Sequence, residues 1–170
     1  SDGTFIETEK YNYVFGENHV SNFKKNLRSN FDAYNHWIYK AMKNENKGNY
    51  LEVGPGGCEL LNTFKRKGWK CEGFELSKWI KSKDIFHDIN KISKKYKDVL
   101  VFHDVLEHTV NPIQILKRFS KFQTKGGKLF LAYPNSSSLK ARILKTKWSM
   151  VAPLAHLNFF SIDSTKILLE

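Results

Sequence analysis

The chain has 170 residues, of which 41% are hydrophobic and 14% aromatic, so it can bury a core and is too apolar for a disordered protein. No apolar run approaches the roughly 20 residues that a membrane span needs, and the first residues, SDGTFIETEK, have no signal-peptide pattern. Cys58 and Cys71 have neither CxxC nor zinc-site spacing, which favours reduced thiols in a cytoplasmic protein.

The net charge of +11 raises the question of a nucleic-acid partner. Only 4 of the 28 basic residues are arginine, the usual residue for phosphate and base recognition. The excess is also spread along the chain, with 16 basic and 9 acidic residues in 49–132 and 5 and 2 in 133–170. We therefore favour a lysine-rich solvated surface, and a polyanion partner is the second interpretation.

Residues 1–48 are predicted to form an N-terminal region with an irregular aromatic stretch over 1–19 and one amphipathic helix. The apolar residues of that helix recur at three- and four-residue steps: Val20, Phe23, Leu27, Phe31, Tyr34, Ile38 and Ala41. The turn residues NENKGN end it. We expect the aromatic stretch to act as a lid on the domain that follows.

Residues 49–170 are predicted to alternate strands and helices. Strands are expected at 49–53, 70–76, 84–87, 99–103 and 128–134. Helices are expected after the first strand (face Leu60, Leu61 and Phe64), over 77–83 with Ser77 as cap, over 111–127 with Asn111 as cap and Gly126 at the exit, around 137–145, and from Ser161. Such alternation predicts a Rossmann-like α/β fold, an open and mostly parallel sheet with helices on both faces.

A glycine-rich loop, Gly54-Pro55-Gly56-Gly57, follows the first strand and leads into a helix. In open α/β sheets, ligands bind beyond the carboxyl ends of the strands, where the strand order reverses. Glycine tolerates positive φ and lets a ligand approach the backbone, and the helix start offers N–H groups to an anion. The loop therefore predicts a cofactor site, although many such turns contain glycines for chain reversal only.

Glu75 strengthens this prediction, because an acid at the end of the second strand can accept hydrogen bonds from the hydroxyls of an adenosine ribose. A dinucleotide fingerprint needs a small residue where this chain has Glu59. Glu52 adds negative character before the glycines. The combination favours a ligand that carries a cation over NAD.

These segments together resemble a class I S-adenosylmethionine-dependent methyltransferase of the group that includes the ubiquinone-pathway O-methyltransferases. The similar segments are LEVGPGG, GFELS, VLVFHDVLEHTVNP, KGGKLFLAYPN and AHLNFFSIDSTKILLE, which occur in the family's order from residue 50 to 170. The resemblance implies S-adenosylmethionine as cofactor. It also implies a sheet that lacks the last two strands of the family fold.

The resemblance also implies roles for residues at matching positions. Gly54, Pro55 and Gly56 would line the methionine portion of the cofactor, with Glu52 near its ammonium group. Glu75 would hold the ribose and Leu76 the adenine. Asp88 and Ile89 match the position that meets the adenine amine, and His103 and Asp104 lie near the transferred methyl group.

Histidine is the natural base for an oxygen nucleophile, and His108 and His156 are the two candidates. The alternative for His108 is a structural role, which the family resemblance implies: it caps or braces its loop. We expect no metal site, because the histidines show no helical i,i+4 ligand pair. Tyr133, Trp148 and Met150 either contact the acceptor or belong to the core.

The leading hypothesis is an enzyme that methylates a small molecule, most simply on oxygen: a sugar, a quinone-like ring or a lipid-linked intermediate. An RNA or protein methyltransferase that uses the basic surface is the second hypothesis. A domain that keeps the fold but has lost turnover is the third. The sequence alone does not choose the acceptor, since acceptor specificity lies in lids and inserts.

Overall fold

The computed structural model describes residues 37–42, 44–78, 80–152 and 155–170. The aromatic stretch and most of the predicted N-terminal helix lie outside these residues. Residues 37–42 are helical and bury Ile38 and Met42 against the core beside β1. The prediction of Ala41 as a buried position is wrong, because Met42, four residues after Ile38, takes the core-facing position and leaves Ala41 exposed.

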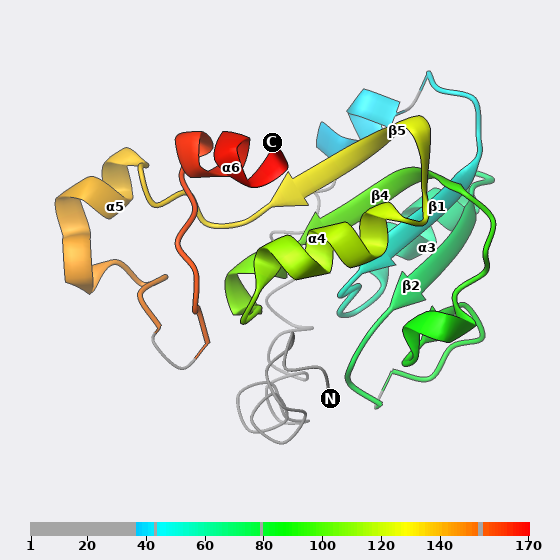
Figure 1. The fold of residues 1–170 in the computed structure, drawn as a ribbon, viewed down its shortest axis with the longest axis horizontal. Helices are drawn as coiled ribbons and strands as arrows, with labels where there is room; N and C mark the ends of the chain where they lie inside the picture. Colours follow the sequence, from blue (N-terminus) through cyan, green and yellow to red (C-terminus); the bar gives the residue numbers. More distant parts are fainter. Residues whose placement is uncertain (1–36, 43, 79, 153–154) are drawn as a thin grey trace.

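Five parallel strands form one sheet in the order β3-β2-β1-β4-β5 (Figure 1). Their bounds are β1 Asn49–Val53, β2 Lys70–Phe74, β3 Ile85–Phe86, β4 Lys97–His103 and β5 Gln123–Ala132. The chain builds outward from β1 to β3 and then crosses to β4 on the other side, so the strand order reverses between β1 and β4. The Rossmann-like fold is thus confirmed, with no sixth strand among the described residues.

Helices cover both faces of the sheet because successive side chains of each strand point to opposite faces. On one face, α3 (Glu59–Arg66) packs Leu60, Leu61 and Phe64 against a core that includes Tyr50. On the other, α4 (Pro112–Ser120) packs Ile115, Leu116 and Phe119. Figure 1 shows α4 in front of the sheet and α3 behind it. The predicted apolar face of α3 is confirmed.

The helix predicted over 77–83 is wrong, because the described residues of that segment form turns and irregular backbone. The N–H of Ser77 donates to the carboxylate of Glu75 at 2.9 Å, so the segment is tied back to the end of β2. A helix of seven residues is also too short to be stable without packing. The 3₁₀ helix η1 (Ile89–Lys91) follows β3.

The predicted exit of α4 at Gly126 is also wrong, since α4 ends at Ser120 and β5 already begins at Gln123. Lys97 pairs with Gln123, but Val99 pairs with Lys128, so β5 carries an irregular insertion at this point. Gly126 has φ +79° and supplies the left-handed backbone that the insertion needs. The glycines therefore shape a strand and not a helix end.

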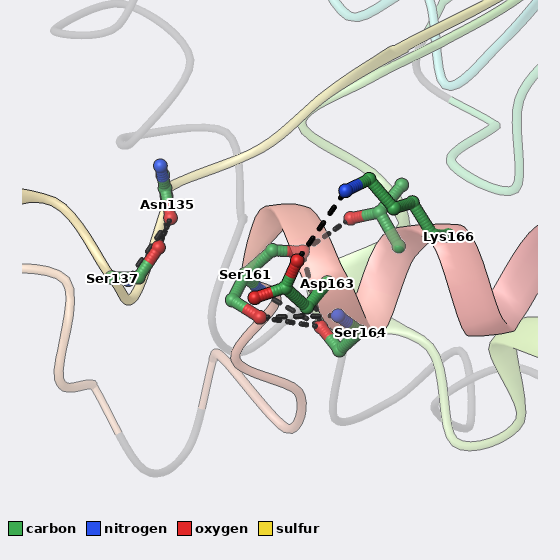
Figure 2. A network of polar contacts seen from close by, with 7 residues as sticks. Asn135, Ser137, Ser161, Asp163, Ser164 and Lys166 are labelled. Carbon is green, nitrogen blue, oxygen red and sulfur yellow. Dashed lines mark hydrogen bonds and ion pairs between the residues drawn. The ribbon is translucent and has the colours of Figure 1, made fainter.

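The C-terminal region contains α5 (Leu139–Leu144), the 3₁₀ helix η3 (Lys145–Lys147) and α6 (Ile162–Leu169). Figure 2 shows the start of α6, where Ser161 and Ser164 form a reciprocal capping box. The predicted helix start at Ser161 is confirmed. No helix within the described part of the chain combines the length and the apolar character needed to cross a bilayer.

Candidate active site

The candidate site lies at the edge of the sheet where the parallel strands end. There β1 leads into the glycine loop, β2 leads into Glu75, and β4 ends at His103 and leads into Asp104. β1 and β4 are neighbours on either side of the reversal point. This is the position at which open α/β sheets bind ligands.

The glycine loop changes the direction of the chain through residues that have positive φ and no side chain. Gly54 has φ +69°, and a Cβ on it would lie 2.5 Å from a methyl carbon of Val105. Gly56 has φ +48°, and Pro55 accepts a hydrogen bond from the N–H of Cys58 at 2.7 Å. Cys58, at φ 62°, is the N-cap residue of α3, and its Sγ donates to the carbonyl of Gly56 at 3.8 Å instead of accepting from a helix N–H. The loop thus presents backbone groups, with no room for a side chain at Gly54.

Glu52 lies under this loop. Its carboxyl accepts hydrogen bonds from the hydroxyl of Tyr50, at 3.0 Å, and from the backbone N–H of Leu61 in the first turn of α3. Burial raises the pKa of Glu52 to about 8, against the lowering effect of these hydrogen bonds. The side chain therefore braces the start of α3 behind the loop. Its predicted place beside an ammonium group stays a prediction.

Glu75 is held against the same loop. Its carboxylate accepts hydrogen bonds from the backbone N–H groups of Ser77, Gly56 and Leu76. Burial raises the pKa of Glu75, and these hydrogen bonds oppose that shift. A carboxylate has about four lone-pair sites, so at least one remains for a ligand hydroxyl. The structure thus joins the two segments that sequence analysis linked only by chain order.

The residues predicted to meet adenine follow β2 and β3. Leu76 and Ile89 are both partly buried and pack against the core on the α4 face. Asp88 is exposed, and its Oδ1 caps η1 by accepting from the N–H of Asn90 at 2.9 Å. Asp88 thus has a structural role in the described chain, and its role toward adenine stays a prediction.

At the end of β4 the backbone takes an unusual conformation. Asp104 has φ 53°, which is rare outside glycine, and its N–H donates to the carbonyl of Ala132 at 2.8 Å. His103 Nε2 and Asp104 Oδ2 are 3.8 Å apart, and the Asp104 side chain is 60% exposed. Non-glycine residues in left-handed backbone gather at active sites. The conformation holds the Asp104 carboxylate toward solvent at the strand end.

His108 and His156 come together although they are far apart in the chain. Their ring centroids are 4.8 Å apart. The Nδ1 of His108 donates to the carbonyl of Ala155 and that of His156 to the carbonyl of Met150, each at 2.7 Å. Burial lowers the pKa of His108, so its neutral form is favoured.

Backbone hydrogen bonds fix this pair. η2 (Leu106–His108) follows β4, and the carbonyl of Glu107 accepts from the N–H groups of Leu157 and Asn158 at 2.7 and 3.1 Å. The side-chain amide of Asn158 donates to the carbonyl of Thr109 at 2.6 Å. We call residues 155–158 the clasp segment, because it is fastened along η2.

Glu107 is the residue that sequence analysis missed. It is 2% exposed, and burial raises its pKa to about 8. Its Oε2 has no hydrogen-bond partner among the described residues. The available signal in the sequence was an acid placed between the apolar Leu106 and a histidine. Burial of an acid without a partner is costly, so an acid at such a position indicates a specific role.

Two aromatic residues left open between core and acceptor contact are packed inside the protein. Trp148 is buried. The ring of Tyr133 lies 4.7 Å from that of Phe160, and its hydroxyl pairs with Thr165 of α6. These contacts favour the core for both. Met150 is half-buried and contributes its carbonyl to His156.

Comparison with known proteins identifies the family. Residues 24–170 match the family described as "Methyltransferase domain", and the chain belongs to that family. A search of curated proteins found no match.

Solved structures share the fold at low sequence identity. The plantazolicin methyltransferase BpumL, in complex with SAH, is 15% identical, with a TM-score of 0.65 over 94% of this chain and 71% of that one. A possible histamine N-methyltransferase from Thermotoga maritima is 19% identical, with a TM-score of 0.68 over 92% and 77%. A putative methyltransferase in complex with the Haloferax volcanii Trm112 activator is 12% identical, with a TM-score of 0.60 over 85% and 70%.

The family and the fold together make the chain a class I S-adenosylmethionine-dependent methyltransferase. The residues at the strand ends fit this cofactor. Gly54 has a positive φ and leaves the backbone of the loop without a side chain, and Glu75 keeps acceptor capacity beside the loop.

Proposed function

We propose that the protein transfers a methyl group from S-adenosylmethionine to an oxygen atom of a small molecule. The observation that carries this proposal is the contact of the Glu75 carboxylate with the glycine loop at the strand ends, together with the paired imidazoles of His108 and His156 in the segments that follow β4. A sugar, a quinone-like ring or a lipid-linked intermediate would fit. The sequence resemblance to ubiquinone-pathway O-methyltransferases supports an oxygen acceptor.

The cofactor supplies, when bound, an activated methyl group on a sulfonium, which an in-line nucleophile displaces. The chain's own task is to align the partners, and such alignment carries much of the rate enhancement. Gly54, Pro55 and Gly56 would line the methionine portion, and Glu75 would hold the ribose. Leu76 and Ile89 would flank the adenine.

The two imidazoles favour an oxygen acceptor over other acceptor atoms. A hydroxyl acceptor must lose its proton as the new carbon–oxygen bond forms, and a neutral histidine can take that proton. The pKa of His108 is lowered by burial, so the ring is available as a base at neutral pH. His103 and Asp104, at the end of β4, would lie near the transferred methyl group.

A second candidate function is methylation of RNA or protein. The net charge of +11 favours it. One structural neighbour is a putative methyltransferase in complex with the Trm112 activator, which shows that this fold can carry a protein partner. The scarcity of arginine, by contrast, keeps the small-molecule acceptor in first place.

We also propose that the enzyme is cytoplasmic. Cys58 and Cys71 are both buried as thiols, which supports a reducing compartment. We further propose that the region 1–48 and the segment 136–160 cover the acceptor side of the site.

Calorimetric titration with S-adenosylmethionine tests the cofactor site. We expect Glu75→Ala and Glu75→Gln to weaken binding at least about tenfold, because a hydrogen bond to a charged group contributes about 1.5–3 kcal/mol. The conservative Gln variant separates lost binding from lost folding. Asp163→Ala, which removes an exposed acid on α6, is the matched control and should bind as the parent chain does. Unchanged binding in both Glu75 variants, or binding of NAD instead, would contradict the proposed site.

A screen of hydroxyl-bearing acceptors then tests the reaction. S-adenosylhomocysteine should form when a small hydroxyl-bearing acceptor is present, and each methyl transfer should release the proton of that hydroxyl. Turnover with RNA or a protein only would favour the second candidate, and cofactor binding without any turnover would favour an inactive binding domain.

A further inference from the structure

Three metal-ligating side chains meet at the edge of the candidate site. Glu107 and His108 come from η2 and His156 from the clasp segment, and their ligand atoms lie within 4.8 Å of one another. We infer that Glu107, His108 and His156 bind a divalent transition-metal ion. This inference goes beyond methyl transfer, because none of the three is needed to hold S-adenosylmethionine.

The hydrogen bonds of the two histidines suit metal binding. A carbonyl oxygen only accepts, so the Nδ1 atoms that contact Ala155 and Met150 must carry the protons. In a neutral ring the lone pair then belongs to Nε2. Metal-binding histidines in proteins typically donate the other ring N–H to a carbonyl or carboxylate in this way, which fixes the tautomer and the ring orientation.

Glu107 provides an independent indication of a ligand. The residue is 2% exposed, and its Oε2 has no hydrogen-bond partner among the described residues. Buried polar atoms are otherwise almost always satisfied. A cation held between this carboxylate and the two imidazoles would supply the missing interaction.

The arrangement does not depend on an ion for its assembly. The carbonyl of Glu107 binds the N–H groups of Leu157 and Asn158, and the Asn158 amide binds the carbonyl of Thr109. These bonds hold the two halves of the cluster together. His108 and His156 are only partly buried, so an ion has a path from solvent.

The donor set selects the class of ion. Two imidazole nitrogens favour Zn²⁺ and other first-row transition ions over Mg²⁺ or Ca²⁺, which prefer all-oxygen sites. Three protein ligands leave coordination positions open, as in catalytic zinc sites. Our expectation of no metal considered only helical i,i+4 pairs, whereas these ligands come from two segments that the tertiary fold joins.

One consequence rests on the proposed function. An ion at this position would bind the acceptor oxygen and acidify its hydroxyl, whose proton would pass to solvent water, and the imidazoles would then be ligands in place of the proposed base. The site also stands without that function, because metal binding is measurable in the absence of cofactor and acceptor.

Equilibrium dialysis of the full chain tests the site. The chain, free of any histidine tag and stripped with a chelator, is dialysed against Zn²⁺ or Co²⁺, and bound metal is measured by elemental analysis. We expect one ion per chain and a Co²⁺ absorption spectrum typical of nitrogen and oxygen ligands. Glu107→Gln and His156→Ala should each weaken binding more than about tenfold, since even loss of a supporting partner costs about 10–100-fold.

His87→Ala is the matched control, because His87 is exposed at the end of β3 and lies outside the cluster. This variant should bind metal as the parent chain does. Glu107→Gln keeps the size of the buried side chain, and circular dichroism checks that it folds. Binding that is absent, or equal in the parent chain and the two cluster variants, would overturn the inference. S-adenosylmethionine binding, measured separately with the Glu75 variants, would stand or fall independently.

Discussion

Three carboxyl groups near the strand ends, those of Glu52, Glu75 and Glu107, are nearly inaccessible to solvent. Burial raises the pKa of each one. Their surroundings differ, because Glu52 braces a helix, Glu75 accepts three backbone N–H groups and Glu107 has one unsatisfied oxygen. The same residue type thus serves three purposes that its neighbours decide.

Glu52→Gln should reduce the dependence of stability on pH. The folded pKa of Glu52, about 8, is above the ordinary 4.5, so its contribution is fully present below pH 4.5 and is lost as the pH rises through about 8. Each pKa unit corresponds to about 1.4 kcal/mol, so the variant should gain up to several kcal/mol relative to the parent near pH 9. Urea unfolding near pH 5 and near pH 9 measures the difference.

Asp163→Asn serves as a control for this measurement, because Asp163 is an exposed acid on α6. This variant should leave the difference in stability between the two pH values as it is in the parent chain. If Glu52→Gln changes the unfolding free energy by the same amount at both pH values, the pKa of the Glu52 carboxyl does not change on unfolding as described.

At the scale of elements, local signals set the helix starts. Asn111 caps α4 by accepting from the N–H of Gln114 at 3.0 Å, and Pro112 occupies the first position. The helix then buries Ile115, Leu116 and Phe119 on the sheet. Because α4 follows β4 and η2 directly, its start also fixes the backbone that carries Glu107 and His108.

Asn111→Ala should destabilise the protein by about 1 kcal/mol, because it removes the cap and leaves a helix N–H unsatisfied. Asn111→Ser, which restores a capping oxygen, should recover most of the loss. Chemical denaturation of the two variants and the parent chain measures both. Equal stability of the Ala and Ser variants would mean that the cap contributes nothing here.

At the scale of the whole molecule, the candidate cofactor site joins elements from both sides of the reversal point. The loop after β1, the carboxylate after β2 and the strained residue after β4 all border the same edge. A ligand there contacts several elements that must all be in place. Binding should therefore stabilise the fold as a unit.

S-adenosylmethionine at about one hundred times its dissociation constant should raise the unfolding free energy by about 2.7 kcal/mol. For a chain of this size, that corresponds to a melting shift of roughly 5–10 °C. Differential scanning fluorimetry measures the shift, with NAD as the control ligand. A shift in the parent chain that persists in Glu75→Gln would place the cofactor elsewhere.

Much of the fold could be predicted because its signals are local. The apolar face of α3, the cap of α4 and the start of α6 each rest on residues a few positions apart. Two predictions failed where tertiary pairing decided. Lys97 and Val99 of β4 pair with β5, so Gln123–Gly127 belong to a strand and not to the predicted helix. The hydrogen bond from Ser77 to Glu75 holds the segment after β2 in a non-helical conformation.

The sequence by itself determined the class of the fold, the glycine loop and the acid at the end of β2. Strand–helix alternation and glycine-rich turns depend on neighbouring residues, so local patterns are enough to predict them. Only the tertiary structure decided how Glu75 meets the loop and that Glu107, His108 and His156 meet at all. The physical reason is that each contact joins segments that are distant in the chain. The contact of Glu75 with the loop depends on the pairing of β1 with β2, and the cluster depends on hydrogen bonds between η2 and the clasp segment.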